Sequence, residues 1–227
     1  MFDASLLPPS PVPKAEPPRD CPLCPRLVAF REELRAKHPD WWNAPVPAFG
    51  DPDAWVAIAG LAPGMHGANR TGRPFTGDFA GLLLYETLLK FGLAEGKYEE
   101  RIDDTLRLTG IAIVNSVRCL PPQNKPLPQE IATCRSFYTL SLAGLRNVRI
   151  LIALGQIAHT SAVRTAGGKL SEYKFGHLAE HLLPDGRILI DSYHCSRYNQ
   201  NTGRLTREMF EQVFERALEI RRTVREP

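Results

Sequence analysis

Four short apolar runs, each followed by a loop, constrain the fold of this chain more than any other feature. They are WVAIA (55–59), IAIVNSV (111–117), VRILIALG (148–155) and RILIDSYH (187–194). Short runs that are apolar throughout are typical of strands buried on both faces. Helical patterns separate the runs, and strands alternating with helices predict an α/β fold. We expect a three-layer α/β/α sandwich around a central four-stranded, mainly parallel sheet.

The segments between and after these runs have the composition and the ends of helices. One predicted helix follows Cys24 and stops before Pro39, because the residue before a proline disfavours helical geometry. A second spans 81–92 and ends at a glycine, and a third runs from about 129 to 143. One follows the third apolar run, and another closes the chain. The apolar residues of this last helix share one face: Met209, Phe210, Val213, Phe214, Ala217 and Leu218.

The length and composition fit one domain with a tail. Residues 8–18, PPSPVPKAEPP, are too rich in proline to pack, so 1–19 is predicted to be a mobile, extended tail. Residues 20–227 form the single predicted domain, which includes an N-terminal metal-ligating segment and the C-terminal helix. With 43% hydrophobic residues the chain can bury a core of ordinary size.

Charge and hydropathy exclude some classes of protein. The net charge is only +3, so any binding of nucleic acid must come from a local basic surface. No run is long and apolar enough to span a bilayer, and the N-terminus lacks a secretory pattern. The expected location is therefore the cytoplasm, and the chain is expected to be a monomer.

The first apolar run leads into an unusual loop, GLAPGMHGANRTGRPFTGD (60–78), which has five glycines and two prolines. Glycine lets the backbone approach a ligand closely, because no side chain stands in the way. In open parallel sheets the ligand crevice lies at the carboxyl ends of the strands. This loop and those that follow the other runs leave that edge, which is where we expect the binding site.

The five cysteines point away from a disulfide scaffold, since the chain shows no sign of export. Cys21 and Cys24 form a C-x-x-C pair, Cys119 follows the second predicted strand, and Cys134 lies in the next helix. Such a set fits tetrahedral zinc or an iron–sulfur cluster, and the spacing does not separate the two. Buried free thiols are the remaining alternative. We expect a metal here to have a structural role.

Three stretches of the chain together resemble one known family. GLAPGMHGANRTGRPFTGD, VNSVRC and HCSRYNQNTGRLT are similar, in this order, to motifs of the uracil-DNA glycosylase superfamily, and specifically of its family 5 (type b) members. The resemblance runs from Cys21 to about Thr206. In families 4 and 5, four cysteines placed like Cys21, Cys24, Cys119 and Cys134 hold a [4Fe–4S] cluster, so the resemblance favours iron–sulfur over zinc.

Two positions depart from the superfamily pattern. Leu61 stands where most members have an acidic or amide side chain, which removes the usual water-activating group but is similar to family 5. Cys195 replaces the proline of the usual H-P-S motif. The other four cysteines complete a ligand set, so Cys195 is predicted to be a buried thiol beside the histidine.

The resemblance implies a pocket that holds a base flipped out of the DNA stack. Phe75 is the predicted stacking surface, with packing in the core as its alternative. Asn115 is predicted to read the pyrimidine edge, with a turn-forming role as its alternative. His194 is predicted to stabilise the negative charge on the departing base. The full predicted pocket is Gly60, Leu61, Ala62, Gly64, Phe75, Asn115 and His194.

Asp78 is the predicted third catalytic residue beside Asn115 and His194. Because Leu61 cannot orient water, the Asp78 carboxylate is expected to position the water or to stabilise the cationic sugar. Its alternative role is to cap the helix that begins near Phe79. A dissociative reaction that needs little help from a base is a further alternative, with Asn115 and His194 carrying most of the rate.

DNA contacts are expected from the first and last loops. The segment 192–207 contains three arginines and no acidic residue, and a solvated loop is its alternative interpretation. Tyr198 or its neighbours would fill the gap left by the flipped base. The predicted DNA-binding residues are Asn69, Arg70, Ser196, Arg197, Tyr198, Asn199 and Arg204.

The resemblance therefore implies a monofunctional DNA glycosylase of base excision repair that removes uracil and other deaminated or damaged bases. No lysine in the motifs is placed to form a Schiff base, so strand cleavage is not expected. One alternative is a protein that binds uracil or lesions without turnover. Another is a metal-bearing nucleotide-binding redox protein, although the chain has no G-x-x-x-x-G-K-[ST] phosphate loop.

Overall fold

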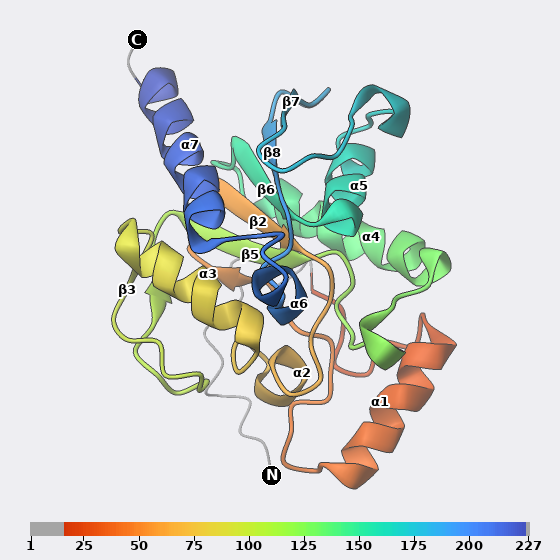
Figure 1. The fold of residues 1–227 in the computed structure, drawn as a ribbon. Coiled ribbons are helices and arrows are strands. Elements are labelled where there is room, and N and C mark those ends of the chain that lie inside the picture. The colour runs from red at the N-terminus through yellow and green to blue at the C-terminus, as the bar shows by residue number, and fades with distance from the viewer. Residues whose placement is uncertain (1–15, 226–227) are drawn as a thin grey trace.

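The computed structural model describes residues 16–225, and its centre is a twisted sheet (Figure 1). Among these residues the sheet has six strands in the order β1-β5-β2-β6-β8-β7. The strands are β1 (Phe49–Gly50), β2 (Val56–Gly60), β5 (Ile111–Asn115), β6 (Ile150–Leu154), β7 (Glu180–Leu182) and β8 (Ile188–Ser192). The four predicted strands are confirmed as the parallel centre, and short antiparallel strands extend both edges.

Helices cover both faces of the sheet, which confirms the three-layer sandwich (Figure 1). None of the helices in the described part of the chain is long and apolar enough to cross a membrane. The helices are α1 (Pro25–Lys37), α2 (Ala68–Thr71), α3 (Phe79–Lys90), α4 (Pro128–Gly144), α5 (Gln156–Thr165), α6 (Arg197–Asn201) and α7 (Arg207–Arg225), with 3₁₀ turns at Pro122–Asn124 and Leu170–Glu172.

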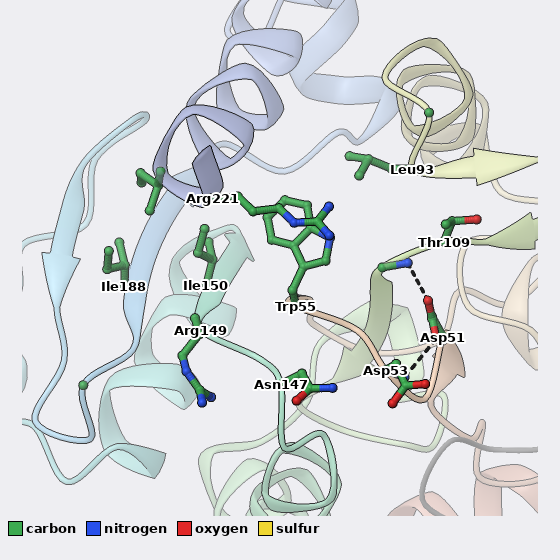
Figure 2. Close-up of a pocket in the computed structure, with 14 residues that line it drawn as sticks. Asp51, Asp53, Trp55, Leu93, Thr109, Asn147, Arg149, Ile150, Ile188 and Arg221 are labelled. Carbon is green, nitrogen blue, oxygen red and sulfur yellow. Dashed lines mark hydrogen bonds between the residues drawn. The ribbon is translucent and has the colours of Figure 1, made fainter. Parts of the chain in front are cut away.

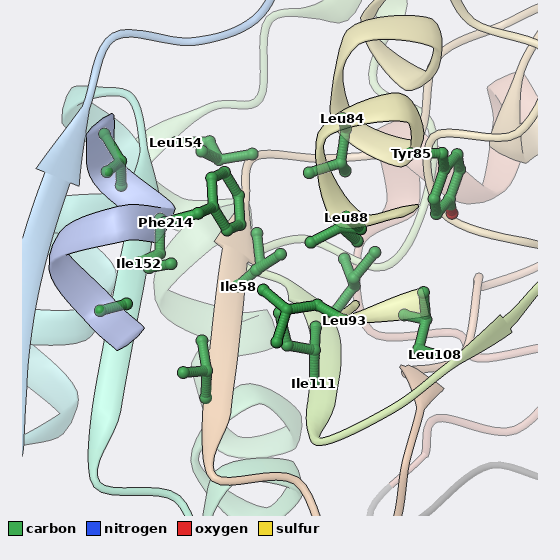
Figure 3. Packing of buried hydrophobic residues seen from close by; sticks show 14 of the residues in the cluster. Ile58, Leu84, Tyr85, Leu88, Leu93, Leu108, Ile111, Ile152, Leu154 and Phe214 are labelled. Carbon is green, nitrogen blue, oxygen red and sulfur yellow. The ribbon is translucent and has the colours of Figure 1, made fainter. Parts of the chain in front are cut away.

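The two faces of the sheet differ in the size of their side chains. Branched residues such as Ile58 and Ile152 pack with α3 and α7, and Figure 3 shows Leu84, Leu88 and Phe214 closing this side. Alternate residues point the other way, and many of them are alanines that lie against α4 and α5. Burial on both faces is why the strands read as continuous apolar runs rather than alternating patterns.

Between α3 and β5 in the sequence, the chain forms a small two-stranded sheet of β3 (Ala94–Glu95) and β4 (Arg107–Leu108). The loop that joins its strands reaches the glycine-rich loop through a buried ion pair. Arg73 donates two hydrogen bonds to the Asp104 carboxylate, at 2.7 and 2.8 Å, and one to the backbone oxygen of Arg101. This ion pair ties the 60–78 loop to the segment that joins β3 and β4.

The N-terminal end of the described chain packs against the domain. Most of the predicted tail, residues 1–15, lies outside the described residues, whereas Glu16 to Arg19 belong to the fold. Glu16 accepts a hydrogen bond from the Ala48 backbone and forms an ion pair of 3.2 Å with the buried Arg118. Arg19 lies over the Trp42 ring. The packed part of the chain therefore begins at least four residues before the predicted boundary.

Candidate active site

A cavity of about 440 Å³ opens at the carboxyl ends of β2, β5 and β8, where the sequence predicts a binding site. It brings together six of the seven predicted pocket residues, together with Asp78. Gly60 lies at the end of β2, directly behind the cavity wall. The cavity is lined by Leu61, Ala62, Pro63, Gly64, Ala68, Phe75, Asp78, Phe79, Ala80, Asn115, Asn124, His194, Ser196 and Arg197.

The strand ends bring Gly60 and Asn115 into contact. The two residues are register partners in the parallel pair of β2 and β5. A Cβ atom at position 60 would lie 2.1 Å from the Asn115 Oδ1 atom, so only glycine leaves room for this amide. The Oδ1 atom is buried and has no hydrogen-bond partner among the described residues. A buried acceptor without a donor is costly, and it becomes favourable when a ligand supplies the N–H.

Phe75 forms part of the cavity wall and part of the core. Its side chain is 8% exposed and belongs to the cluster under α3, yet its ring also borders the cavity. The ring centroid lies 6.2 Å from that of His194, with 27° between the planes. The backbone of Phe75 has a φ of +59°, a conformation that non-glycine residues rarely adopt. The core and stacking interpretations are thus compatible.

His194 follows β8 by two residues, and its ring lines the cavity. Burial lowers the pKa of its imidazole to about 4, since nothing nearby compensates the charged form. The ring is therefore neutral at pH 7 and carries a single N–H. The Asn199 side chain donates a hydrogen bond of 2.8 Å to the His194 carbonyl oxygen, which fixes the turn that presents the ring.

Asp78 stands at the N-cap position of α3, but its side chain makes no capping hydrogen bond to that helix. The carboxylate instead points back across the glycine-rich loop and bonds the backbone of Ala68. A Cβ atom at Gly64 or Gly67 would lie within 2.5 Å of a carboxylate oxygen, so both glycines make room for it. Burial raises the pKa of the Asp78 carboxyl, while the Ala68 backbone and the charges of His66 and Arg70 oppose the rise.

The predicted DNA-binding residues fall into two groups. Four of them are exposed, namely Arg70, Arg197, Tyr198 and Arg204, and Arg197 also lines the cavity. Arg197 lies over the Phe79 ring at 4.8 Å, and Arg204 lies over the Tyr193 ring at 4.7 Å. These contacts hold Arg197 against the start of α3 and Arg204 against the residue that follows β8.

The other three predicted DNA contacts are engaged within the protein. Asn69 is 3% exposed and donates a hydrogen bond of 2.9 Å to the Asn43 side chain, so its side chain has no surface to offer a phosphate. Ser196 is the N-cap of α6 and accepts from the Asn199 backbone. Asn199 bonds the His194 carbonyl, as described above. All three side chains organise the loops that carry the site.

Sequence reasoning missed some of the cavity wall. Asn124 lies in the PPQN segment after β5, and both it and Gln123 have a φ of +56°. Two successive residues in the left-handed conformation give this loop a sharp bend. The neighbouring prolines indicate a turn in the sequence, but they do not show that it brings Asn124 to the cavity. Pro63, Ala68, Phe79 and Ala80 complete the wall through the path of the glycine-rich loop and the start of α3.

The four predicted metal ligands converge in a second place. The residues Cys21, Cys24, Cys119 and Cys134 all line one small pocket beneath α1. Burial raises the pKa of the Cys119 thiol to about 12 and that of Cys134 to about 11, so without a cation both remain protonated. The Arg118 backbone N–H lies 3.3 Å from the Cys134 sulfur. The fifth cysteine, Cys195, is fully buried beside His194, as the sequence predicts.

Contacts around the cysteine pocket hold its walls together. Arg26 of α1 donates two hydrogen bonds, of 2.7 and 2.8 Å, to the Glu130 carboxylate of α4. Glu130 in turn accepts from the Leu127 backbone at the start of α4. A donor set of four thiols in a closed, apolar pocket suits a soft metal ion or an iron–sulfur cluster.

A larger cavity, of about 530 Å³, lies at the opposite, amino ends of the strands (Figure 2). The Arg221 guanidinium covers the Trp55 ring at 4.2 Å. The Asp51 carboxylate accepts hydrogen bonds from the backbones of Gly110 and Asp53, so it supports the chain at this end. The predicted site residues all lie at the other end of the sheet, so size alone does not identify the active site.

The chain is similar to known proteins over most of its length. The family model described as "Uracil DNA glycosylase superfamily" matches residues 47–218. The chain is 48% identical to a Type-5 uracil-DNA glycosylase of Thermus thermophilus over 198 residues, which is 85% of this chain and 90% of the relative. It is 37% identical to a Type-5 enzyme of Pyrobaculum aerophilum over 202 residues, covering 87% and 88%. A Type-4 uracil-DNA glycosylase of Thermotoga maritima is 31% identical over 170 residues, covering 74% and 78%.

Proposed function

Because the chain belongs to the uracil-DNA glycosylase superfamily, we propose that it hydrolyses the N-glycosidic bond of uracil flipped out of DNA and leaves an abasic site. One observation carries the proposal. An aromatic ring, a buried amide, a carboxylate and a neutral imidazole border the same cavity, of about 440 Å³, at the carboxyl ends of the strands. A single flipped base needs a stacking surface, polar groups for its edge, and groups that act on the bond.

Recognition of the base rests on Phe75 and Asn115. The Phe75 ring stacks on the flat face of the base, which every base possesses. The Asn115 amide forms hydrogen bonds with the pyrimidine edge, and its buried Oδ1 atom accepts an N–H from the base. Because residue 60 is glycine, no side chain occupies the space that this amide needs.

The leaving group is stabilised by His194. Negative charge collects on the base as the bond breaks, and a fixed donor near a base carbonyl lowers the barrier. The pKa of about 4 means that the neutral ring supplies this hydrogen bond at pH 7. The ring acts without transferring its proton, because a uracil anion is stable enough to leave unprotonated when a donor contacts it.

Asp78 acts on the sugar side of the bond. Its carboxylate borders the cavity and makes no capping bond to α3; it bonds the Ala68 backbone and also faces the cavity where the sugar would lie. The carboxylate orients the attacking water or stabilises the cationic sugar, a task that Leu61 cannot perform. If the dissociative alternative holds, Asn115 and His194 carry most of the rate, and non-additive losses in double variants would reveal that they act as one unit.

The four-cysteine pocket is proposed to hold a [4Fe–4S] cluster, with zinc as the weaker alternative. The four thiols line one small pocket, and the resemblance to families 4 and 5 supports the cluster over zinc. When bound, the cluster supplies a structural cross-link between the segment that precedes α1, the loop after β5, and α4.

The DNA backbone is proposed to lie across Arg70, Arg197 and Arg204, with Tyr198 filling the gap left by the base. These side chains are exposed, and Tyr198 is 71% exposed although aromatic. Neutralising phosphates with arginine makes binding depend strongly on salt. We further propose that the enzyme acts as a monomer in the cytoplasm, associated with the nucleoid, and that it accepts other deaminated or damaged bases.

The test is base release from oligonucleotides that carry one uracil, hypoxanthine, xanthine or hydroxymethyluracil. Heating in alkali then converts each abasic site into a strand break that a gel resolves. The expected result is cleavage at uracil after alkali and none before it, since the enzyme itself does not cut the strand. Tight binding of uracil-containing DNA without abasic sites would identify a binding protein instead. Iron and sulfide analysis of the purified protein tests the cluster.

A further inference from the structure

A buried cluster of two histidines and one aspartate lies outside both sites described above. His159 comes from α5, His181 from β7 and Asp191 from β8. The Nδ1 atom of His159 lies 2.8 Å from Asp191 Oδ1, and the Nε2 atom of His181 lies 3.3 Å from Asp191 Oδ2. One ligand atom from each of the three residues lies within 4.8 Å of the others. We refer to these residues as the His–Asp–His cluster.

The hydrogen bonds of His159 define which of its nitrogens carries a proton. Its Nε2 atom lies 3.1 Å from the backbone oxygen of Tyr173. A carbonyl oxygen only accepts, so Nε2 must donate, and the neutral ring then has a lone pair on Nδ1. That lone pair faces the Asp191 carboxylate at 2.8 Å. Two electron-rich atoms at this distance require a positive species between them, which is either a second proton or a metal ion.

We propose that the His–Asp–His cluster binds one divalent transition-metal ion of the zinc type. Two imidazole nitrogens and a carboxylate oxygen are a donor set that such ions prefer. A histidine that binds metal through one nitrogen commonly donates its other N–H to a carbonyl, as His159 does to Tyr173. A second proton on His159 satisfies only its own contact with Asp191. The His181 contact with Asp191 also fits a hydrogen bond from Nε2–H, so zinc binding has to be measured to separate a metal ion from a cluster held by protons alone.

The His–Asp–His cluster is buried, and His181 is its most exposed member. The side chains of His159 and Asp191 are at most 1% exposed, and that of His181 is 14% exposed. Aromatic rings wall the cluster, with Phe175 edge-on to His159 and Tyr173 edge-on to His181. An ion would enter past His181 and join α5 and the edge strand β7 to β8. The site would be structural, because its residues do not line the active-site cavity.

Zinc binding by the full chain, with its four-cysteine site loaded, tests the proposal directly. After treatment with a weak chelator that leaves iron in place, equilibrium dialysis against Zn²⁺ is followed by analysis of both metals. The wild type is expected to bind one zinc in addition to its iron. Asp191→Asn and His181→Gln should each raise the zinc Kd at least about 10-fold. His38→Gln, which removes a histidine that stacks on Trp41 outside the cluster, should leave it unchanged.

Thermal unfolding supplies a readout that needs no activity. At about 100 times the Kd, zinc should raise the Tm of the wild type by roughly 5 °C and leave that of Asp191→Asn unmoved. The proposal is overturned if the wild type takes up no zinc beyond the amount bound by Asp191→Asn and shows no rise in Tm. A second proton on His159 then holds the cluster together. Either result is independent of base excision.

Discussion

The hydroxyl of Tyr98 lies 3.2 Å from the carbonyl oxygen of Phe75, and it donates a hydrogen bond to that oxygen. The same hydroxyl accepts from the backbone N–H of Gly77 at 3.1 Å, so it holds both sides of the turn that presents the Phe75 ring. The Tyr98 ring packs against Tyr85, whose own hydroxyl donates to the Pro74 carbonyl. Two phenols therefore stabilise a turn whose central residue has a strained, positive φ.

Tyr98→Phe should lower the rate of uracil release in single-turnover assays by about 10-fold, because it removes two hydrogen bonds, each worth about 1 kcal/mol, and keeps the ring. The effect should fall on the cleavage step more than on DNA affinity, since Tyr98 does not line the cavity. Tyr173→Phe, at a tyrosine far along the chain, is the matched control. An unchanged cleavage rate in Tyr98→Phe would show that the turn keeps its shape without this residue.

Asp78→Ala should reduce uracil release by about 10²- to 10⁴-fold, the usual contribution of a positioned carboxylate. The Tm should fall only modestly, because the side chain makes no capping bond to α3 and the variant loses the single bond to the Ala68 backbone. Asp53→Ala, at an exposed aspartate near the other end of the sheet, controls for loss of charge. A large fall in Tm with normal cleavage would leave Asp78 with a purely structural role.

The pH dependence of cleavage should separate Asp78 from His194. Burial raises the pKa of Asp78. As the pH is lowered, the cleavage rate should therefore fall when this carboxylate is protonated, at a pH above the ordinary carboxyl range. The pKa of His194 is lowered to about 4, so its ring stays neutral from pH 6 to 9. On the alkaline side of the Asp78 limb, the single-turnover rate should therefore show no further inflection from His194. An inflection near pH 6.5 that vanishes in His194→Asn would contradict this assignment.

Cys24→Ser should abolish stoichiometric iron and lower the Tm, since it removes one of four thiols from the pocket under α1. Cys195→Ser is the internal control, because that thiol lies beside His194 and should leave the iron content unchanged. Metal analysis and the visible absorption of the two variants make the comparison. Loss of iron from both variants would overturn the assigned ligand set.

Gly60→Ala should slow uracil release by about 10²-fold, because its Cβ atom would displace the Asn115 amide from the cavity. Gly176→Ala is the matched control, since its Cβ would make only an ordinary contact of 3.7 Å with Ala179. Release of uracil and of hypoxanthine should be compared in both proteins. If Gly60→Ala keeps its full rate on uracil, Asn115 does not read the base.

Much of the fold could be predicted because its signals are local. The first apolar run, expected at 55–59, forms β2 at Val56–Gly60, and the helix expected to stop before Pro39 ends at Lys37. Each signal depends on neighbours within a few positions. The edge strands β1 and β7 have two and three residues, which is too short for a pattern, and they form only because a longer strand offers its free edge.

The site could be predicted in part for a similar reason. Strand ends meet at one edge of a parallel sheet, so Asn115 and His194 were expected near Phe75, and their side chains do share a cavity. Contacts between distant segments could not be foreseen. Asn69 turns inward because Asn43, 26 positions earlier, offers a partner, and Tyr98 reaches Phe75 from the loop that joins β3 and β4. The residues next to Asn69 and Phe75 in the sequence give no sign of these two distant partners.

The ion pair between Glu16 and Arg118 bears on how far the chain can be shortened. Arg118 is completely enclosed, and its backbone also contacts the sulfur of Cys134. Removing the residues up to and including Glu16 would leave the Arg118 guanidinium buried next to the cysteines without this carboxylate. Breaking a buried ion pair in this way costs roughly 3–5 kcal/mol of folding free energy. A proteolytic cut or an engineered truncation at this point would therefore weaken the proposed metal site without removing any of its four cysteines.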